Sequence, residues 1–219
     1  LIDGSLWSGS YVTVGIFHEV LMSKIAWSIT GEVSIGSSKI IEIFLIFLGK
    51  LLLIAVAYQI SINSNIKNSN QSLLFILLSL IFMSLNDYDL GSVDHFSYRD
   101  IPVLLLVIFF PFIEKNNFFS MSLAIVLGFL AIPVLFWGLD RGIIYNLILF
   151  VLIVYFIIKS QKKIWISLIS SSIISVLLFK FLLGLEFNYF IENSVNILNE
   201  INYIHGIIHP IPLTSDVNS

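Results

Sequence analysis

The chain has no cysteine and few charged residues. Without cysteine it has no disulfides, no thiolate metal sites and no cysteine nucleophile. Only 11% of its 219 residues are charged and 58% are hydrophobic, whereas soluble domains carry about 25% charged residues. This composition is not that of an ordinary soluble domain, and it predicts lipid as the main solvent.

The apolar residues form long blocks, which support the same interpretation. About 20 apolar residues are needed to cross the hydrocarbon core of a bilayer, and we expect six spanning helices. Their predicted ranges are 40–60, 73–85, 101–113, 119–139, 143–158 and 164–185. The second and third are short, so they either extend into their flanks or form a re-entrant pair. The predicted fold class is all-α, a polytopic transmembrane helix bundle.

The segments on either side of this predicted membrane domain (39–185) are more polar. In residues 1–38, apolar residues recur at helical spacing between 12 and 29. They predict an amphipathic helix, which either lies in the membrane interface or packs within an external loop. Residues 186–219 read as an external, amphipathic and then proline-containing tail. Because the chain begins at Leu1 without a signal peptide, we expect it to be a fragment with at least one helix upstream.

Lysine residues in short loops predict the orientation. The loop at 159–163 has three lysines and no acid, so we place it in the cytoplasm. Alternation along the chain then puts Lys67, Lys115 and the acid Glu114 in the cytoplasm as well. Most other acids and all four histidines fall on the external face. We therefore expect a multi-pass protein of a bacterial inner membrane with its chemistry on the external side.

The external loop at 86–100 is the densest polar stretch, with four acids beside His95 and Arg99. Such a set can bind a divalent cation, or a phosphate through Arg99. Asp100 precedes an apolar segment, so capping of the following helix is an equal alternative for this acid.

A second external candidate is the corner between two apolar segments, at Asp140 and Arg141. Ionisable groups at membrane depth are costly and are interpreted first as functional. Arg141 is suited to hold a phosphate through two hydrogen bonds. The alternative is a structural ion pair that closes the turn. Another charge, Lys50, is predicted near the middle of the first span, with Glu42 as one candidate partner.

Two acids in the first segment are further candidates. Asp3 can act as a general base or hold a metal, although an Asp-Gly pair also favours a turn. Glu19 adjoins His18, a pairing common on polar helix faces. His205 and His209 have the spacing of zinc ligands on a helix, but Gly206 and Pro210 interrupt that pattern and we assign no metal site there.

An acid in the first external segment, followed by an amphipathic helix and many spans, resembles the membrane-embedded GT-C glycosyltransferases. The matching residues are Asp3 and the stretch 15–19. The resemblance implies that Asp3, or Glu19 in its place, is the catalytic acid and that Arg99 and Arg141 hold the lipid phosphate. It implies a polyprenyl-phosphate sugar as donor, the lipid bilayer as partner and no nucleic acid.

Three alternative functions stay open at this point. A polysaccharide polymerase or ligase also has many spans and external arginines. A transporter predicts inverted repeats, spans broken by Gly or Pro, and charges near the midplane. A non-catalytic membrane scaffold is the third.

Overall fold

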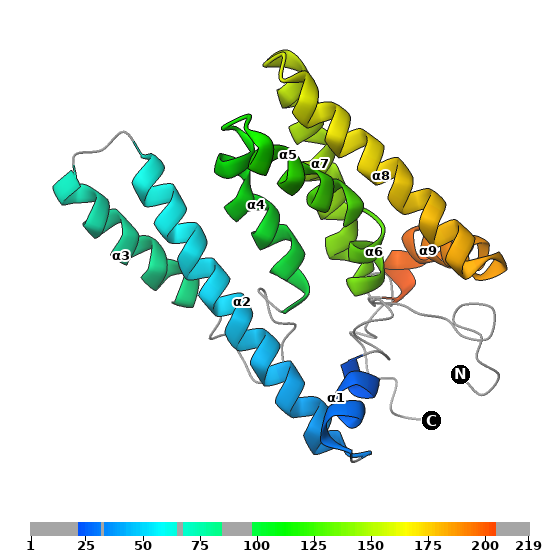
Figure 1. The fold of residues 1–219 in the computed structure, drawn as a ribbon. Coiled ribbons are helices and arrows are strands. Elements are labelled where there is room, and N and C mark those ends of the chain that lie inside the picture. The colour runs from blue at the N-terminus through cyan, green and yellow to red at the C-terminus, as the bar shows by residue number, and fades with distance from the viewer. Residues whose placement is uncertain (1–21, 32, 65–67, 85–97, 205–219) are drawn as a thin grey trace, which may run out of the picture. The chain divides into compact units, whose positions relative to one another are not determined.

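The computed structural model describes residues 22–31, 33–64, 68–84 and 98–204. Every regular element within these residues is a helix (Figure 1). The elements are α1 (Met22–Thr30), α2 (Ile35–Asn63), α3 (Asn68–Ser84), the 3-10 turn η2 (Tyr98–Asp100), α4 (Ile101–Ile113), α5 (Phe118–Phe129), α6 (Pro133–Trp137), α7 (Leu139–Ile158), α8 (Lys162–Leu183) and α9 (Leu185–Ile204). The predicted all-α fold class is confirmed for this part of the chain.

Three helices are long and apolar enough to cross a membrane, namely α2, α7 and α8. They coincide with the predicted first, fifth and sixth segments. In the most apolar window of each helix only 22%, 28% and 22% of the residues are buried. Isoleucine, leucine and phenylalanine side chains therefore cover much of their outer surface. Such a continuous apolar surface is unusual for a protein in water and suits contact with lipid.

The predicted second and third segments correspond to the shorter apolar helices α3 and α4. With 13 residues, α4 is about 20 Å long at the usual helical rise. That is less than the hydrocarbon core of a typical bilayer, which is about 30 Å thick. The expectation that these two segments are short is confirmed.

The prediction of one continuous helix over 119–139 is wrong, because the segment is divided into α5 and α6. Pro133 has no backbone N–H, so it cannot donate to the carbonyl four residues earlier. The chain turns after Phe129 and resumes as a helix at Pro133, where the N–H of Val134 donates to the carbonyl of Leu130. Proline therefore ends α5 and opens α6.

Side chains from α7 and α8 hydrogen-bond the carbonyls around this break. Tyr145 Oη donates to the carbonyl of Leu127 at 2.7 Å. The single hydroxyl hydrogen of Ser172 is shared between the carbonyl of Gly128 at 3.1 Å and that of Leu168, in its own helix, at 2.8 Å. The amide of Asn146 donates to the carbonyl of Ala131 at 2.9 Å. A broken helix in an apolar setting needs such donors, because an unpaired carbonyl is costly there.

The hydrophobic core lies between α4, α5, α7 and α8. Its most deeply buried large side chains, each less than 2% exposed, are Tyr145, Phe156, Leu106, Ile113, Leu127, Ile164 and Leu168. Gly128 allows α5 and α8 to approach closely. A Cβ atom at Gly128 would lie 2.0 Å from Ser171 Oγ and 2.5 Å from the carbonyl oxygen of Leu168.

On its other side, α4 packs against α2. Leu53 and Val56 of α2 form a small buried cluster with Leu104. One turn earlier on α2, a Cβ atom at Gly49 would meet Ile101 Cγ1 at 4.0 Å, an ordinary contact. Because Ile101 is the first residue of α4, this part of α2 lies level with the start of α4.

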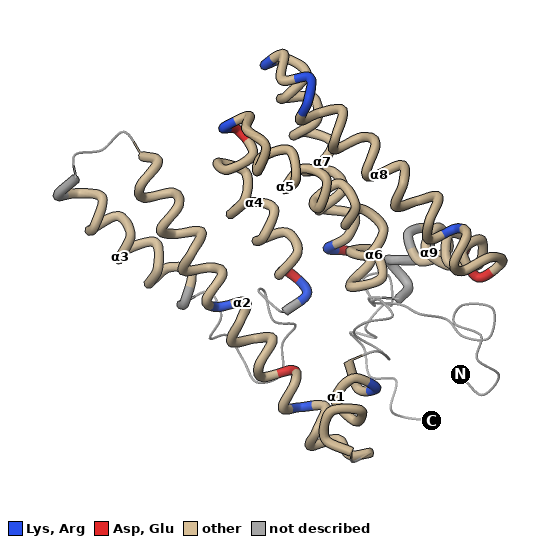
Figure 2. The backbone as a smooth tube through the Cα atoms, viewed as in Figure 1, with Lys and Arg blue, Asp and Glu red and all other residues tan. Residues whose placement is uncertain are grey.

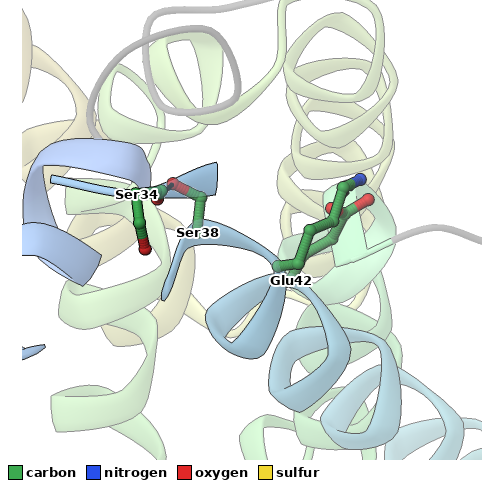
Figure 3. A network of polar contacts seen from close by, with 4 residues as sticks. Ser34, Ser38 and Glu42 are labelled. Atoms are coloured by element: carbon green, nitrogen blue, oxygen red, sulfur yellow. Dashed lines mark hydrogen bonds and ion pairs between the residues drawn. The ribbon is translucent and has the colours of Figure 1, made fainter. Parts of the chain in front are cut away.

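The start of α2 is stabilised by local polar contacts. Ser34 is the N-cap, and its Oγ accepts a hydrogen bond from the N–H of Ser37 at 3.1 Å. Figure 3 shows Ser34, Ser38 and Glu42 along this first part of the helix. Glu42 forms an ion pair with Lys39 at 2.5 Å. The Trp27 indole donates to the carbonyl of Ser34 and so links α1 to the helix.

Two predicted flanking features fall partly in the described residues. The second half of the predicted helix at 12–29 is confirmed by α1, and its first half lies outside the described residues. At the other end of the chain, residues 179–204 belong to a compact unit separate from 14–178. There α9 follows Gly184, whose φ of +56° ends α8. Buried positions 187, 190, 193 and 197 repeat at helical spacing on one face of α9.

Candidate functional site

The structure brings together four of the residues in the two external candidate stretches. Arg99 and Asp100 lie in η2 at the start of α4, and Asp140 and Arg141 lie in the first turn of α7. Ion pairs link the two stretches. We call this group the arginine–aspartate cluster. Figure 2 shows the charged positions at these helix starts and at the opposite helix ends.

The tightest contact in the cluster joins Arg141 and Asp100. Arg141 Nε lies 2.5 Å from Asp100 Oδ1, and the two side chains are 23% and 12% exposed. The Nε–H does not point along this contact and makes no hydrogen bond, so the interaction is electrostatic. Asp100 occupies the predicted N-cap position of α4, but its side chain makes no capping bond. Its role is to hold Arg141.

Asp140 has a different setting. A single oxygen, Oδ2, lies 3.5 Å from Arg99 Nη1 and 3.4 Å from Arg141 Nη1. These distances exceed the 2.7–2.9 Å that is usual for charge-assisted hydrogen bonds. The Asp140 side chain is also 45% exposed, whereas that of Arg99 is 15% exposed. An exposed pair of this kind contributes at most about 1 kcal/mol.

The cluster therefore contains one close ion pair, Arg141 with Asp100, and one weakly held carboxylate, that of Asp140. Asp140 Oδ2 occupies a point between two guanidinium groups, which is the position that an oxygen of a phosphate would take. Arginine suits such a ligand because its planar donor group matches phosphate geometry. Gly138 lies beside the cluster, since a Cβ there would lie 3.5 Å from Asp140 Oδ1 and 3.6 Å from Arg99 Cδ.

Lys50 lies near the middle of α2 (Ile35–Asn63), as predicted for the first span. The adjacent residue Gly49 faces Ile101 at the start of α4, so this part of α2 lies level with the cluster end of α4. Glu42 pairs with Lys39, so the predicted pairing of Glu42 with Lys50 is wrong. Lys50 itself is half-buried.

A second polar group, at the opposite end of α4 and α7, was only partly predicted. Tyr155 Oη donates to Glu114 Oε1 at 2.5 Å, and Lys159 Nζ lies 3.8 Å from the same oxygen. Glu114 was predicted to lie apart from most other acids, whereas Tyr155 was not among the predicted site residues. The signal available was a tyrosine one helical turn before a lysine at the end of an apolar segment.

The two polar groups show that α4 and α7 run in the same direction. The starts of α4 and α7 meet at the arginine–aspartate cluster, and their ends meet at Glu114 and Tyr155. Hence α4 and α7 run parallel, with α5 and α6 returning between them. The turns at 98–100 and 138–141 lie at one end and those at 114–117 and 159–163 at the other, as the predicted alternation requires.

The remaining predicted site residues cannot be placed. Asp3, Glu19 and His95 lie outside the described residues, as do His205 and His209. Within the described ranges, no three His, Asp or Glu side chains come close enough to hold a metal ion. Comparison of the chain with protein-family models, curated proteins and solved structures finds no match.

Proposed function

We propose that the chain is a multi-pass protein of a bacterial inner membrane that binds the phosphate of a lipid-linked substrate at the arginine–aspartate cluster. The observation that carries the proposal is the placement of Asp140 Oδ2 between Arg99 and Arg141. An incoming phosphate would displace this exposed carboxylate and gain two guanidinium groups. Asp100 would keep Arg141 in position throughout.

The reaction we propose is transfer of a sugar from a polyprenyl-phosphate donor to an acceptor on the external face. When the glycosidic bond breaks, negative charge grows on the departing lipid phosphate. Two arginines at that point would stabilise the charge, and Asp100 would hold one of them, Arg141, in place beforehand. An acid from the first segment, Asp3 or Glu19, would remove the proton of the acceptor hydroxyl.

The membrane arrangement is part of the same proposal. The apolar surfaces of α2, α7 and α8 support their crossing of the bilayer, and the shorter helices would complete a bundle of about six spans. The lysine-containing turn at 159–163 would be cytoplasmic by the positive-inside rule. The arginine–aspartate cluster, at the other end of α7, would then face outward.

A transporter is the second candidate, and the break between α5 and α6 is the observation that favours it. Broken helices in transporters expose carbonyls that coordinate ions near the midplane. Here the carbonyls of Leu127, Gly128 and Ala131 already accept hydrogen bonds from side chains. The break therefore stabilises the fold as it stands, and the cluster remains the better candidate site.

The experiment is a binding titration with the full chain in lipid nanodiscs, using a fluorescent polyprenyl phosphate as probe. Arg99→Gln should weaken binding at least tenfold, because it removes one of the two guanidinium groups. Asp140→Asn should bind several-fold more tightly than the unchanged protein, because the competing carboxylate is gone. Lys39→Gln is the matched control, since it removes an exposed, ion-paired cation elsewhere.

The two cluster variants separate a binding site from a structural network. If the four residues only hold α4 to α7, then Asp140→Asn will not improve binding and Arg99→Gln will act no differently from Lys39→Gln. Either result would refute the phosphate site. Release of radiolabelled sugar from polyprenyl-phosphate sugars, with hydroxyl acceptors added to the same samples, tests the transfer step separately. Binding without any release would leave a binding protein and would exclude the proposed transferase.

A further inference from the structure

The opposite end of the helices carries a second surface, built from two turns that are tied together. Gln161 Nε2 donates to the carbonyl of Glu114 at 3.2 Å, which joins the turn between α7 and α8 to the turn after α4. Residues Asn116 and Ser160 have φ angles of 52° and 56°, so each turn reverses the chain tightly. We call residues 114–119 and 158–163 the lysine surface.

Exposed lysines dominate this surface. They are Lys115, Lys159, Lys162 and Lys163. The one acid within its two segments is Glu114, which is already engaged by Tyr155 and Lys159. For the other three lysines, the described residues supply no carboxylate within ion-pair distance. The lysine surface thus carries a net positive charge that the described part of the chain does not neutralise.

Large apolar side chains lie among these lysines. Phe118 and Ile158 are 79% and 77% exposed, and Phe119 is 58% exposed. The ammonium group of Lys115 lies 5.2 Å from the centre of the Phe112 ring, so its stem runs along an aromatic side chain. A soluble anion could be bound by the lysine ammonium groups alone. Exposed apolar groups beside them fit a ligand that has both an anionic head and a hydrocarbon part.

We propose that the lysine surface binds the headgroups of anionic phospholipids. Basic clusters at the ends of membrane helices attract such lipids, and their lysines act additively near an anionic surface. This inference depends on the proposed membrane arrangement but not on the arginine–aspartate cluster. The phosphate of the lipid would lie between the turns, and its acyl chains beside Phe118 and Ile158.

Native mass spectrometry of the detergent-solubilised full chain tests the inference. Phosphatidylglycerol or phosphatidylcholine is added, and the ratio of the two bound lipids is measured. The unchanged protein should prefer phosphatidylglycerol. The double variant Lys162→Gln/Lys163→Gln should lose about 25-fold of that preference, roughly fivefold for each lysine. The control Lys24→Gln/Lys39→Gln removes the same charge from residues outside the lysine surface and should keep the preference.

Three results would overturn the inference. The first is equal binding of both lipids to the unchanged protein, and the second is an equal loss of preference in both double variants. The third is displacement of phosphatidylglycerol by an equal concentration of inorganic phosphate, which would indicate a site for a free anion. Binding of polyprenyl phosphate by Lys162→Gln/Lys163→Gln, measured in parallel, reports on the arginine–aspartate cluster. It should be unchanged, so failure of one proposal is distinguishable from failure of the other.

Discussion

The contact between α5 and α8 gives the sharpest stability prediction, because it depends on one glycine. Replacing Gly128 with alanine places a methyl group 2.0 Å from Ser171 Oγ and 2.5 Å from the carbonyl oxygen of Leu168. The Ser171 hydroxyl can rotate away, but the backbone carbonyl cannot. Ordinary contact begins near 3.4 Å, so α8 must move away from α5 by about 1 Å.

The cost follows from the contacts that this shift disturbs. Overpacking of a well-packed core costs about 1–3 kcal/mol. The same shift weakens the contact of Ser172 Oγ with the Gly128 carbonyl, a loss of at most about 1 kcal/mol because this hydroxyl also donates to the Leu168 carbonyl at 2.8 Å. Alanine recovers up to about 1 kcal/mol through its helix propensity. The net destabilisation expected for Gly128→Ala is therefore about 2 kcal/mol.

The assay is thermal unfolding in detergent, followed by intrinsic tryptophan fluorescence. For a chain of this length, about 2 kcal/mol corresponds to a decrease of roughly 4–8 °C in Tm. Gly49→Ala is the matched control, since Gly49 is also a buried helical glycine but its nearest contact would be an ordinary 4.0 Å. This variant should be unchanged or slightly more stable. The double variant Gly128→Ala/Ser171→Ala should not recover stability, because the Leu168 carbonyl remains.

A Gly128→Ala protein as stable as the Gly49→Ala protein would refute the close packing of α5 on α8. Full recovery of stability in the double variant would show that Ser171 alone limits the approach of α8 to α5. The Leu168 carbonyl would then lie farther from the added methyl group than 2.5 Å.

Three further predictions concern the cluster, the helix break and the orientation. Arg141→Gln should destabilise the protein by about 1–3 kcal/mol, because Asp100 is largely buried and loses its close partner. Asp140→Asn should cost less than about 1 kcal/mol, because its ion pairs are long and exposed. Unfolding in denaturant measures the free energy of unfolding of both variants. Tyr145→Phe should cost about 1–3 kcal/mol by leaving a buried carbonyl at the end of α5 without its donor, and equal stability of the two proteins would contradict the capping role. In intact cells, a membrane-impermeant thiol reagent should label Asp140→Cys but not Lys163→Cys, and the reverse pattern would move the cluster to the cytoplasm.

Much of the helical framework could be predicted from the sequence, and the reason is physical. The length of an apolar run is set by the hydrocarbon thickness, so α2, α7 and α8 are visible as uninterrupted blocks. The break at Pro133 was missed because apolarity alone defined the segment. Pro133 is itself compatible with an apolar run, and its effect lies in the hydrogen bond that it cannot donate.

The candidate site was predictable residue by residue but not as a group. Charges at the edges of apolar segments singled out Arg99, Asp140 and Arg141, because such charges are costly. Their pairing depends on the parallel arrangement of α4 and α7, which is a tertiary property without a local sequence signal. The contact between Glu114 and Tyr155 also lacks a local sequence signal. Glu114 was predicted to lie apart from most other acids, but Tyr155 lies within an apolar run and is not marked by a neighbouring charge.

The short length of α4 bears on which ligand the cluster can serve. From Arg99 to Glu114 the chain rises about 22 Å if it is helical throughout, whereas the hydrocarbon core is about 30 Å thick. In the proposed arrangement both ends of α4 cannot reach the headgroups of a flat bilayer at once, so the bilayer thins there or one end is recessed. A phosphate carried on an apolar chain can enter such a position sideways from the lipid, whereas a free phosphate would have to leave water to reach it. Competition between the two ligands distinguishes a site for lipid-linked phosphate from a site for free phosphate. At equal concentration, inorganic phosphate should fail to displace polyprenyl phosphate from the cluster.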